Sequence, residues 1–230
     1  MAAIGQISGS IAHELRNPLG TIRSSFAIVG SHLQATHGPV ARALERIERN
    51  IDRCVTIIDE LLAYTRVRDV HLEAVAIDDW LTEQVIDEDF PDSISVVLDC
   101  QSGTTMLIDR ERLRRAILNV LLNAWQAFTE SEYQCAQPTV TISTRVEDGH
   151  LALRVADNGP GIPEDIRERI FEPLFSTKSF GVGLGLPLVR QILDQHGGEI
   201  RVDTAPGEGT AITLTVPITD GQAAGSRPEN

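Results

Sequence analysis

A histidine followed at once by a carboxylate, His13 and Glu14, lies in the first amphipathic segment of the chain. Hydrophobic residues recur there every three or four positions from Ile4 to Leu33, which predicts a helix. At about 100° per residue, His13 falls on the polar face, with Asn17 one turn further along. A carboxylate beside an imidazole can keep one ring nitrogen protonated and make the other a better nucleophile. A lone histidine is more often a solvated surface residue, so spacing alone leaves both interpretations open.

Pro18 follows Asn17 inside the same predicted helix. Proline lacks an N–H donor, and its ring clashes with the carbonyl of Glu14, which costs about 3 kcal/mol inside a helix. A bend at that cost, directly after a polar-face histidine, favours a functional role. The amide of Asn17 could then orient a water toward a group attached to His13.

Two asparagines, Asn119 and Asn123, share one face of an otherwise apolar predicted helix. They are either buried amides bonded to loop backbone or neutral oxygen ligands for a hard cation such as Mg²⁺ carrying phosphates. Asn123 is the candidate metal ligand, with Asn119 assisting.

A glycine turn, Asp157-Asn-Gly159-Pro-Gly161, directly follows a predicted strand. Glycines permit a tight turn and the close approach of a planar ligand, and the carboxylate could accept a hydrogen bond from an exocyclic amine. Taken alone the pattern is weak, because many ordinary turns look like it.

A second glycine segment, Gly181-Val-Gly183-Leu-Gly185-Leu186, opens another predicted helix. Backbone N–H groups at a helix start favour phosphate, although the segment is neither a P-loop nor a dinucleotide fingerprint. Lys178, the only lysine in the chain, comes just before it and is a candidate phosphate contact, with chance placement as the alternative. Phe171 and Phe175 are expected to pack in a lid rather than stack on a base.

The elements that position these residues divide the chain in two. A second apolar stripe, from Val40 to Leu62, follows the break at Thr36–Pro39 and predicts a helical hairpin. Two helices alone cannot bury both stripes, so we expect a homodimer with a four-helix bundle. This gives a helical domain at 1–68 and a second domain at 69–219, with a mobile tail at 220–230.

The second domain is predicted to be α+β, because its strands and helices do not alternate strictly. The predicted strands are His71–Ile77, Ile94–Cys100, Thr139–Val146, His150–Ala156, Glu199–Thr204 and Thr210–Pro217. The predicted helices are Asp78–Asp87, Arg110–Phe128, Glu164–Glu172 and Leu186–Gln195. A hairpin turn is expected at Glu147-Asp148-Gly149.

Charge and composition exclude several classes. The 230 residues carry 20 basic and 33 acidic side chains, a net charge of −13, which argues against binding nucleic acid or an anionic membrane. Residues 1–68 hold 8 arginines and 6 acids, and residues 69–230 hold the remaining 12 basic and 27 acidic residues. No apolar run reaches about 18 residues and no signal peptide is expected. Three scattered cysteines indicate reduced thiols in a cytoplasmic protein.

Five motifs in order make the chain resemble the two-component sensor histidine kinases, over roughly residues 3–218. Its H-box-like segment is Ser10-Ile-Ala-His13-Glu14-Leu-Arg-Asn17-Pro18-Leu. The similar N, G1, F and G2 boxes are Asn119–Asn123, Asp157-x-Gly159-x-Gly161, Phe171-x-Pro173-x-Phe175 and Gly181-x-Gly183-x-Gly185. The short interval between the last two is similar to kinases of the nitrogen-regulation type.

The resemblance implies a dimeric four-helix bundle followed by the α/β sandwich shared with Hsp90, gyrase B and MutL. It implies that Asp157 binds the adenine of ATP, that Gly159 and Gly161 let the base approach, and that Asn123 and Asn119 hold Mg²⁺. Lys178 and the glycine segment through Leu186 would contact phosphate. His13 would take the γ-phosphoryl group with help from Glu14, and Asn17 would serve a phosphatase activity.

The implied partner is the receiver domain of a response regulator, and any membrane attachment would come through a sensory region before His13. Two other classes remain open at this point. One is a nucleotide-gated ATPase or clamp of the same superfamily, and the other is a non-catalytic adaptor.

Overall fold

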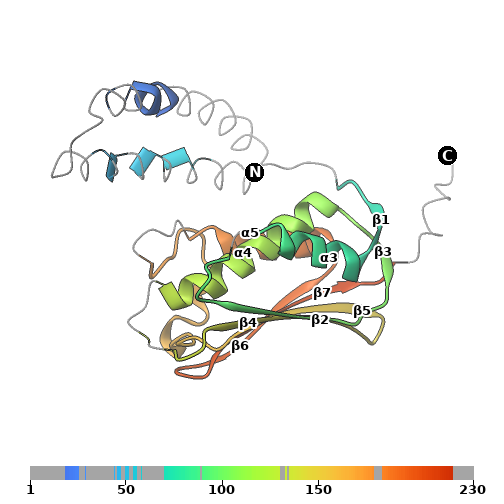
Figure 1. Ribbon diagram of the computed structural model, residues 1–230. Helices are drawn as coiled ribbons and strands as arrows, with labels where there is room; N and C mark the ends of the chain where they lie inside the picture. Colours follow the sequence, from blue (N-terminus) through green and yellow to red (C-terminus); the bar gives the residue numbers. More distant parts are fainter. Residues whose placement is uncertain are drawn as a thin grey trace. The chain divides into compact units, whose positions relative to one another are not determined.

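The computed structural model describes residues 19–25, 29, 44, 46–47, 50–51, 54–55, 58, 70–88, 90–129, 133, 135–178 and 183–219 (Figure 1). The chain divides into two compact units, Met1–Arg68 with Ser179–Leu184, and Asp69–Lys178 with Gly185–Asn230. The predicted site residues His13, Glu14, Asn17 and Gly181 lie outside the described residues, as does the predicted tail at 220–230.

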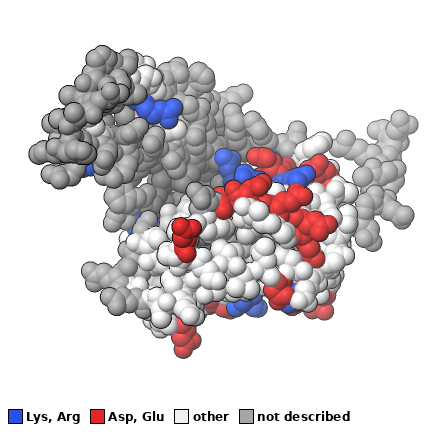
Figure 2. All heavy atoms as spheres, viewed as in Figure 1, with Lys and Arg blue, Asp and Glu red and all other residues white. Residues whose placement is uncertain are grey.

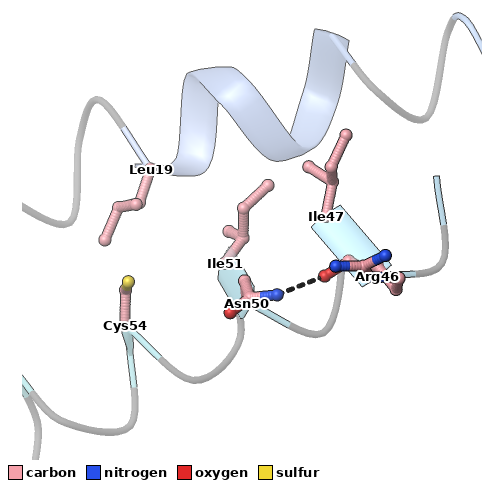
Figure 3. Close-up of a pocket in the computed structure, with 6 residues that line it drawn as sticks. All are labelled: Leu19, Arg46, Ile47, Asn50, Ile51 and Cys54. Carbon is pink, nitrogen blue, oxygen red and sulfur yellow. Dashed lines mark hydrogen bonds between the residues drawn. The ribbon is translucent and has the colours of Figure 1, made fainter. Parts of the chain in front are cut away.

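The first unit is helical wherever it is described between residues 19 and 58. Leu19, from the first apolar stripe, faces Ile47 and Ile51 of the second stripe (Figure 3). They line a largely apolar hollow of about 380 Å³, together with Arg46, Asn50 and Cys54. Ile51 and Ile58 are 6% and 8% exposed. The two stripes therefore face each other, as the predicted helical hairpin requires.

The second unit contains a five-stranded sheet with the strand order β2-β4-β5-β7-β6. Every neighbouring pair is antiparallel except β2 and β4, which are parallel. The strands are β2 (Ser95–Cys100), β4 (Thr139–Glu147), β5 (His150–Asp157), β6 (Glu199–Ala205) and β7 (Gly209–Pro217). A separate two-stranded ribbon pairs β1 (Glu73–Ala76) with β3 (Thr105–Ile108).

Three helices cover one face of this sheet (Figure 1). They are α3 (Ile77–Ile86), α4 (Arg110–Thr129) and α5 (Gly185–Gln195). Burial on α4 recurs at helical spacing, with Leu113, Ile117 and Leu121 at most 1% exposed. Burial on the strands alternates, as at Ile142 and Leu153, so each strand turns one face to the core. This is the predicted α/β sandwich.

Acidic side chains gather over α3 (Figure 2). The helix contains Asp78, Asp79 and Glu83 and no basic residue. Arg110 of α4 pairs with Glu83 at 3.7 Å, which neutralises only part of this charge. This helix therefore carries a net negative charge.

Asp78, at the start of α3, joins that helix to the sheet. Its carboxylate accepts hydrogen bonds from the hydroxyl of Thr144 at 2.6 Å, the hydroxyl of Ser102 at 2.7 Å and the N–H of Gly103 at 2.7 Å. Burial acts to raise the pKa of Asp78, but these hydrogen bonds outweigh it and hold the pKa below its ordinary value. Thr144 is fully buried on β4, so the cluster links α3 to the inner face of the sheet.

A second buried junction joins the start of α4 to the end of α5. Asp109, 7% exposed, accepts a hydrogen bond from the N–H of Arg112 at 3.1 Å and so caps α4. The N–H of Asp109 donates to Nε2 of His196 at 3.1 Å, and Nδ1 of His196 lies 2.8 Å from the carbonyl oxygen of Ile192. Because Nε2 accepts, Nδ1 carries the proton and donates to that carbonyl. Arg112 also donates to the side chain of Gln195.

The six predicted strands and three of the four predicted helices match observed elements to within two residues at each end. The turn at Asp148 and Gly149 has φ of 49° and 76°, the positive values that a two-residue hairpin turn needs. Strand β3 was not predicted, because it is only four residues long and is defined by its pairing with β1.

The predicted helix Glu164–Glu172 is wrong. Two short 3₁₀ turns, η1 (Glu164–Ile166) and η2 (Arg169–Phe171), stand in its place, and neither contains a buried residue. An α-helix this short needs a packed apolar face to be stable, and this segment has none.

In the parts of the chain that the structure describes, no helix combines the length and hydropathy needed to cross a membrane.

Candidate functional site

The predicted site residues of the second unit meet around the C-terminal half of α4. A Cβ added at Gly185, the first residue of α5, would lie 2.8 Å from Oδ1 of Asn119. A Cβ added at Gly159 would lie 3.4 Å from Cβ of Ala127 and 3.5 Å from the ring of Phe128. The start of α5 and the turn after β5 therefore both approach α4 closely, at positions where glycine leaves room.

Asn119 is satisfied within the helix pair. Its amide nitrogen donates to the carbonyl of Arg115 at 2.8 Å, and its amide oxygen faces the α-carbon of Gly185. A Cβ at residue 185 would require that amide to shift, so glycine allows this approach with the side chain of Asn119 in place. Asn119 thus sets the spacing between α4 and α5.

Lys178 lies against the amide face of α4. Its Nζ donates to Oδ1 of Asn123 at 2.8 Å and to Oε1 of Gln126 at 2.5 Å. The ammonium is therefore held between two amide oxygens, three residues apart on one helix face. The structure brings the predicted metal ligand and the predicted phosphate contact together, although 55 residues separate them in sequence.

Gln126 was not predicted to be a site residue. The available signal was its spacing, since Asn119, Asn123 and Gln126 recur at helical intervals on one side of α4.

These residues fit a bound Mg²⁺ through their oxygen chemistry. Amide oxygens that accept hydrogen bonds from an ammonium are neutral oxygen donors of the kind hard cations use. Among the described residues, no three His, Cys, Asp or Glu side chains lie close enough together to hold a metal ion. The amide oxygens of Asn123 and Gln126 are therefore the candidate protein ligands.

Asp157 ends β5 at the start of the first glycine turn. Its Oδ1 accepts a hydrogen bond from the N–H of Gly159 at 2.9 Å. Burial raises the pKa of Asp157 above its ordinary value, although hydrogen bonds from the backbone of Gly159 and Thr210 oppose the rise. A carboxylate has acceptor sites beyond these, so Asp157 can accept a further hydrogen bond from a ligand amine.

The turn after Asp157 is pressed against the β6–β7 turn. Gly161 has φ of +71°, and a Cβ there would lie 2.1 Å from the carbonyl oxygen of Ala205. The N–H of Gly207 donates to the carbonyl of Pro160 at 2.7 Å. The N–H of Ile162 donates to the hydroxyl of Thr204 at 2.9 Å.

Gly209, the first residue of β7, also lies close to the backbone of Asp157. Its φ is +85°, and a Cβ there would lie 2.0 Å from the carbonyl oxygen of Asp157. This turn was not predicted to belong to the site, although Gly207-Glu208-Gly209 repeats the Gly-x-Gly pattern of the predicted site segments.

The two phenylalanines before Lys178 are covered by guanidinium groups. Arg190 of α5 lies over the ring of Phe171, and Arg169 of η2 lies over the ring of Phe175, each at 4.1 Å from the ring centre. This favours packing over base stacking, as expected. Leu174 between them is 69% exposed and has φ of +67°.

Other predicted residues lie nearby in the chain. Gly183 has φ of +74°, and Leu186 is half-buried in the first turn of α5. Gly181 lies outside the described residues.

This sheet, covered on one face by helices that carry amides and meet two glycine turns, defines an ATPase domain of the gyrase B and Hsp90 class. Residues 108–220 match the family model "Histidine kinase-, DNA gyrase B-, and HSP90-like ATPase". Residues 3–69 match "His Kinase A (phospho-acceptor) domain". The chain belongs to the sensor histidine kinases.

Curated relatives include the signal transduction histidine-protein kinase AtoS of Escherichia coli, 32% identical over 95% of this chain and 35% of its own length. Sensor histidine kinase ZraS of Klebsiella oxytoca is 31% identical over 95% of this chain and 47% of its own length. The chain thus spans between a third and a half of these relatives.

Among solved structures, the mycobacterial sensor histidine kinase MprB is 30% identical, with a TM-score of 0.54, over 64% of this chain and 98% of that one. Histidine kinase ThkA in complex with response regulator protein TrrA is 25% identical, with a TM-score of 0.66, over 94% of this chain and 62% of that one. ShkA in complex with AMPPNP has the same fold, with a TM-score of 0.76 at 24% identity over 95% of this chain and 47% of that one.

Proposed function

We propose that this chain transfers the γ-phosphoryl group of ATP to His13 and then passes it to an aspartate of a response regulator. The observation that carries the proposal is the arrangement along α4. The Asp157 turn approaches α4 at Ala127, one helical turn or about 6 Å beyond Asn123. One nucleotide can therefore contact Asp157 at its base and Asn123 at its phosphates.

In this proposal each predicted ATP-binding residue has a task. Asp157 accepts a hydrogen bond from the adenine amine, and Gly159 and Gly161 leave room for the base. Asn123, with Asn119, holds Mg²⁺, which neutralises phosphate charge when bound. Lys178 and the N–H groups of Gly183, Gly185 and Leu186 attract the phosphate oxygens. The finding that ShkA was solved with AMPPNP supports this use of the fold.

The chemistry itself falls to His13. One ring nitrogen of His13 attacks the γ-phosphorus, a P–N bond forms, and the bond from phosphorus to the departing ADP oxygen breaks. Glu14 holds the ring tautomer and takes the proton from the other ring nitrogen. Positioning and charge carry the rate, because the protein contributes little covalent work beyond the nucleophile.

Asn17 serves a second activity in this proposal. One turn beyond His13, its amide orients a water for attack on the phosphorylated aspartate of the regulator. The chain would then act as both kinase and phosphatase toward the same partner.

The proposed function assigns a separate role to each of two domains. Residues 1–68 form the dimerisation and phosphotransfer domain, residues 69–219 the catalytic domain, with a hinge at Arg66–Val70 and a tail at 220–230. Two helices alone cannot bury both apolar stripes completely, which supports pairing of two copies. A response regulator as partner is supported by the complex of ThkA with TrrA.

Incubation with labelled ATP, beside His13→Gln, tests this function. Acid-labile and base-stable label in the parent alone is expected for phosphohistidine. Label that survives in His13→Gln would remove His13 as the nucleophile. Phosphate release without label would instead make the chain a nucleotide-gated ATPase. If neither label nor phosphate release is found, the chain is a non-catalytic adaptor.

A further inference from the structure

Lys178 holds the oxygen of Asn123, which the proposed function needs for a metal ion, together with that of Gln126. Its ammonium lies 2.8 Å from Oδ1 of Asn123 and 2.5 Å from Oε1 of Gln126, and the residue is half-buried. An ammonium offers three donors and no acceptor, so two of its hydrogen bonds are used on α4.

The same amide oxygen cannot serve both cations well. Mg²⁺ binds oxygen at about 2.0–2.1 Å and demands near-octahedral geometry. With Nζ at 2.8 Å from Oδ1 of Asn123, a metal ion on that oxygen would lie within about 5 Å of the ammonium. Two positive charges at that separation in a partly buried site repel strongly.

We propose that Lys178 and nucleotide-bound Mg²⁺ exclude one another at Asn123. Lys178 is an internal cation that holds Asn123 and Gln126 together when no metal is bound, and it leaves them when the metal arrives with the nucleotide. Gln126 is then a positioning residue for Lys178. This inference rests on the proposed function, because it takes Asn123 as the metal ligand.

The alternative is that Lys178 and Mg²⁺ act side by side on the phosphates. In that case Lys178 keeps its hydrogen bonds to Asn123 and Gln126 when the metal is bound, and the metal has no lysine to displace. Mutual exclusion predicts coupling instead, because in the parent the metal must displace the lysine, whereas in a variant without the lysine it binds unopposed.

The test is the affinity for ADP, measured by calorimetry with and without Mg²⁺, in the full chain and in Lys178→Met. The quantity compared is the factor by which Mg²⁺ tightens ADP binding. We expect this factor to be about tenfold larger in Lys178→Met, the scale of one lost hydrogen bond to a charged group. An equal or smaller factor in the variant would overturn the proposal.

Arg201→Met is the matched control. Arg201 is exposed on β6 and pairs with Asp203 at 3.0 Å, so the change removes the same charge without touching α4. Its Mg²⁺ factor should equal that of the parent. A rise as large as in Lys178→Met would assign the effect to net charge and overturn the proposal.

The single lysine gives a second readout that does not depend on affinity. Protein grown with ¹³C-lysine carries one side-chain Cε signal, because Lys178 is the only lysine in the chain. Gln126→Leu should shift this signal in metal-free protein, and the shift between parent and variant should vanish when Mg²⁺ and ADP are both bound. A difference that persists at full size would show that Lys178 stays on Gln126, against the proposal.

The two possible failures are distinguishable. If the parent binds no ADP, the proposed function fails and this inference fails with it. If the parent binds ADP and the Mg²⁺ factor is the same with and without Lys178, the function stands and only the exclusion is refuted.

Discussion

Replacing Gly161 by alanine tests whether the turn after Asp157 is held by its close approach to β6. The change adds one methyl group at a position with φ of +71°, 2.1 Å from the carbonyl oxygen of Ala205. Because that oxygen belongs to backbone, no side-chain rotation can relieve the overlap. Gly149→Ala is the matched control, since Gly149 has φ of +76° and no atom within 4 Å of the added Cβ.

The expected loss of unfolding free energy in Gly161→Ala has two contributions. An alanine in the left-handed region costs about 1 kcal/mol, and both variants carry this cost. Relief of the overlap to an ordinary contact of 3.4 Å requires an opening of 3.4 − 2.1 = 1.3 Å between the turn and β6. Such an opening breaks the hydrogen bonds of Gly207 to Pro160 and of Ile162 to Thr204, at about 1 kcal/mol each. The expected losses are about 3 kcal/mol for Gly161→Ala and about 1 kcal/mol for Gly149→Ala.

Urea unfolding followed by tryptophan fluorescence measures both losses. Trp80 is 2% exposed and Trp125 packs edge-on against Phe90, so the two tryptophans of the chain both report the second unit. ADP affinity should fall at least about tenfold in Gly161→Ala and stay unchanged in Gly149→Ala, because only the first moves Asp157. Equal losses of unfolding free energy in the two variants would refute the proposed bracing.

Three further variants test other contacts. Thr144→Val should lower the unfolding free energy by about 2 kcal/mol at pH 7, since Asp78 loses its 2.6 Å hydrogen bond. The folded pKa of Asp78 is lowered, so this stability is present above the ordinary value of 3.8 and is lost as pH falls through the folded pKa; urea titrations at pH 7 and pH 3 should show the gap narrowing. Asp157→Asn should weaken ADP binding at least about tenfold by calorimetry, because an amide cannot replace both carboxylate acceptors; unchanged affinity would exclude Asp157 from the base contact. Gly185→Ala, whose Cβ would lie 2.8 Å from the amide oxygen of Asn119, should weaken ADP binding several-fold with a loss of about 1 kcal/mol in stability, and a variant that binds as the parent does would contradict the tight spacing of α4 and α5.

The elements that sequence analysis located carry local signals. The apolar spacing of α4 and the alternation of β4 and β5 each repeat several times within one segment, so the pattern alone identifies the element. The segment at Glu164–Glu172 has helix-forming composition, but none of the residues in its two 3₁₀ turns is buried, so core packing does not stabilise it as an α-helix.

What the sequence could not supply is pairing between distant segments. Gln126 shares the helical spacing of Asn119 and Asn123, but its contact with Lys178, 52 residues away, follows only from the fold. The bracing of Gly161 depends in the same way on Ala205, in a different strand. The roles of His13, Glu14 and Asn17 stay predictions, since these residues lie outside the described part of the chain.

The hydrogen bond from Asp109 to His196 joins the start of α4 to the residue that follows α5. Helix α5 has 11 residues, or about 16 Å, from Gly185 to Gln195. Helix α5 is therefore held to α4 near both of its ends, by Asp109 and His196 at one end and by the close approach of Gly185 to Asn119 at the other.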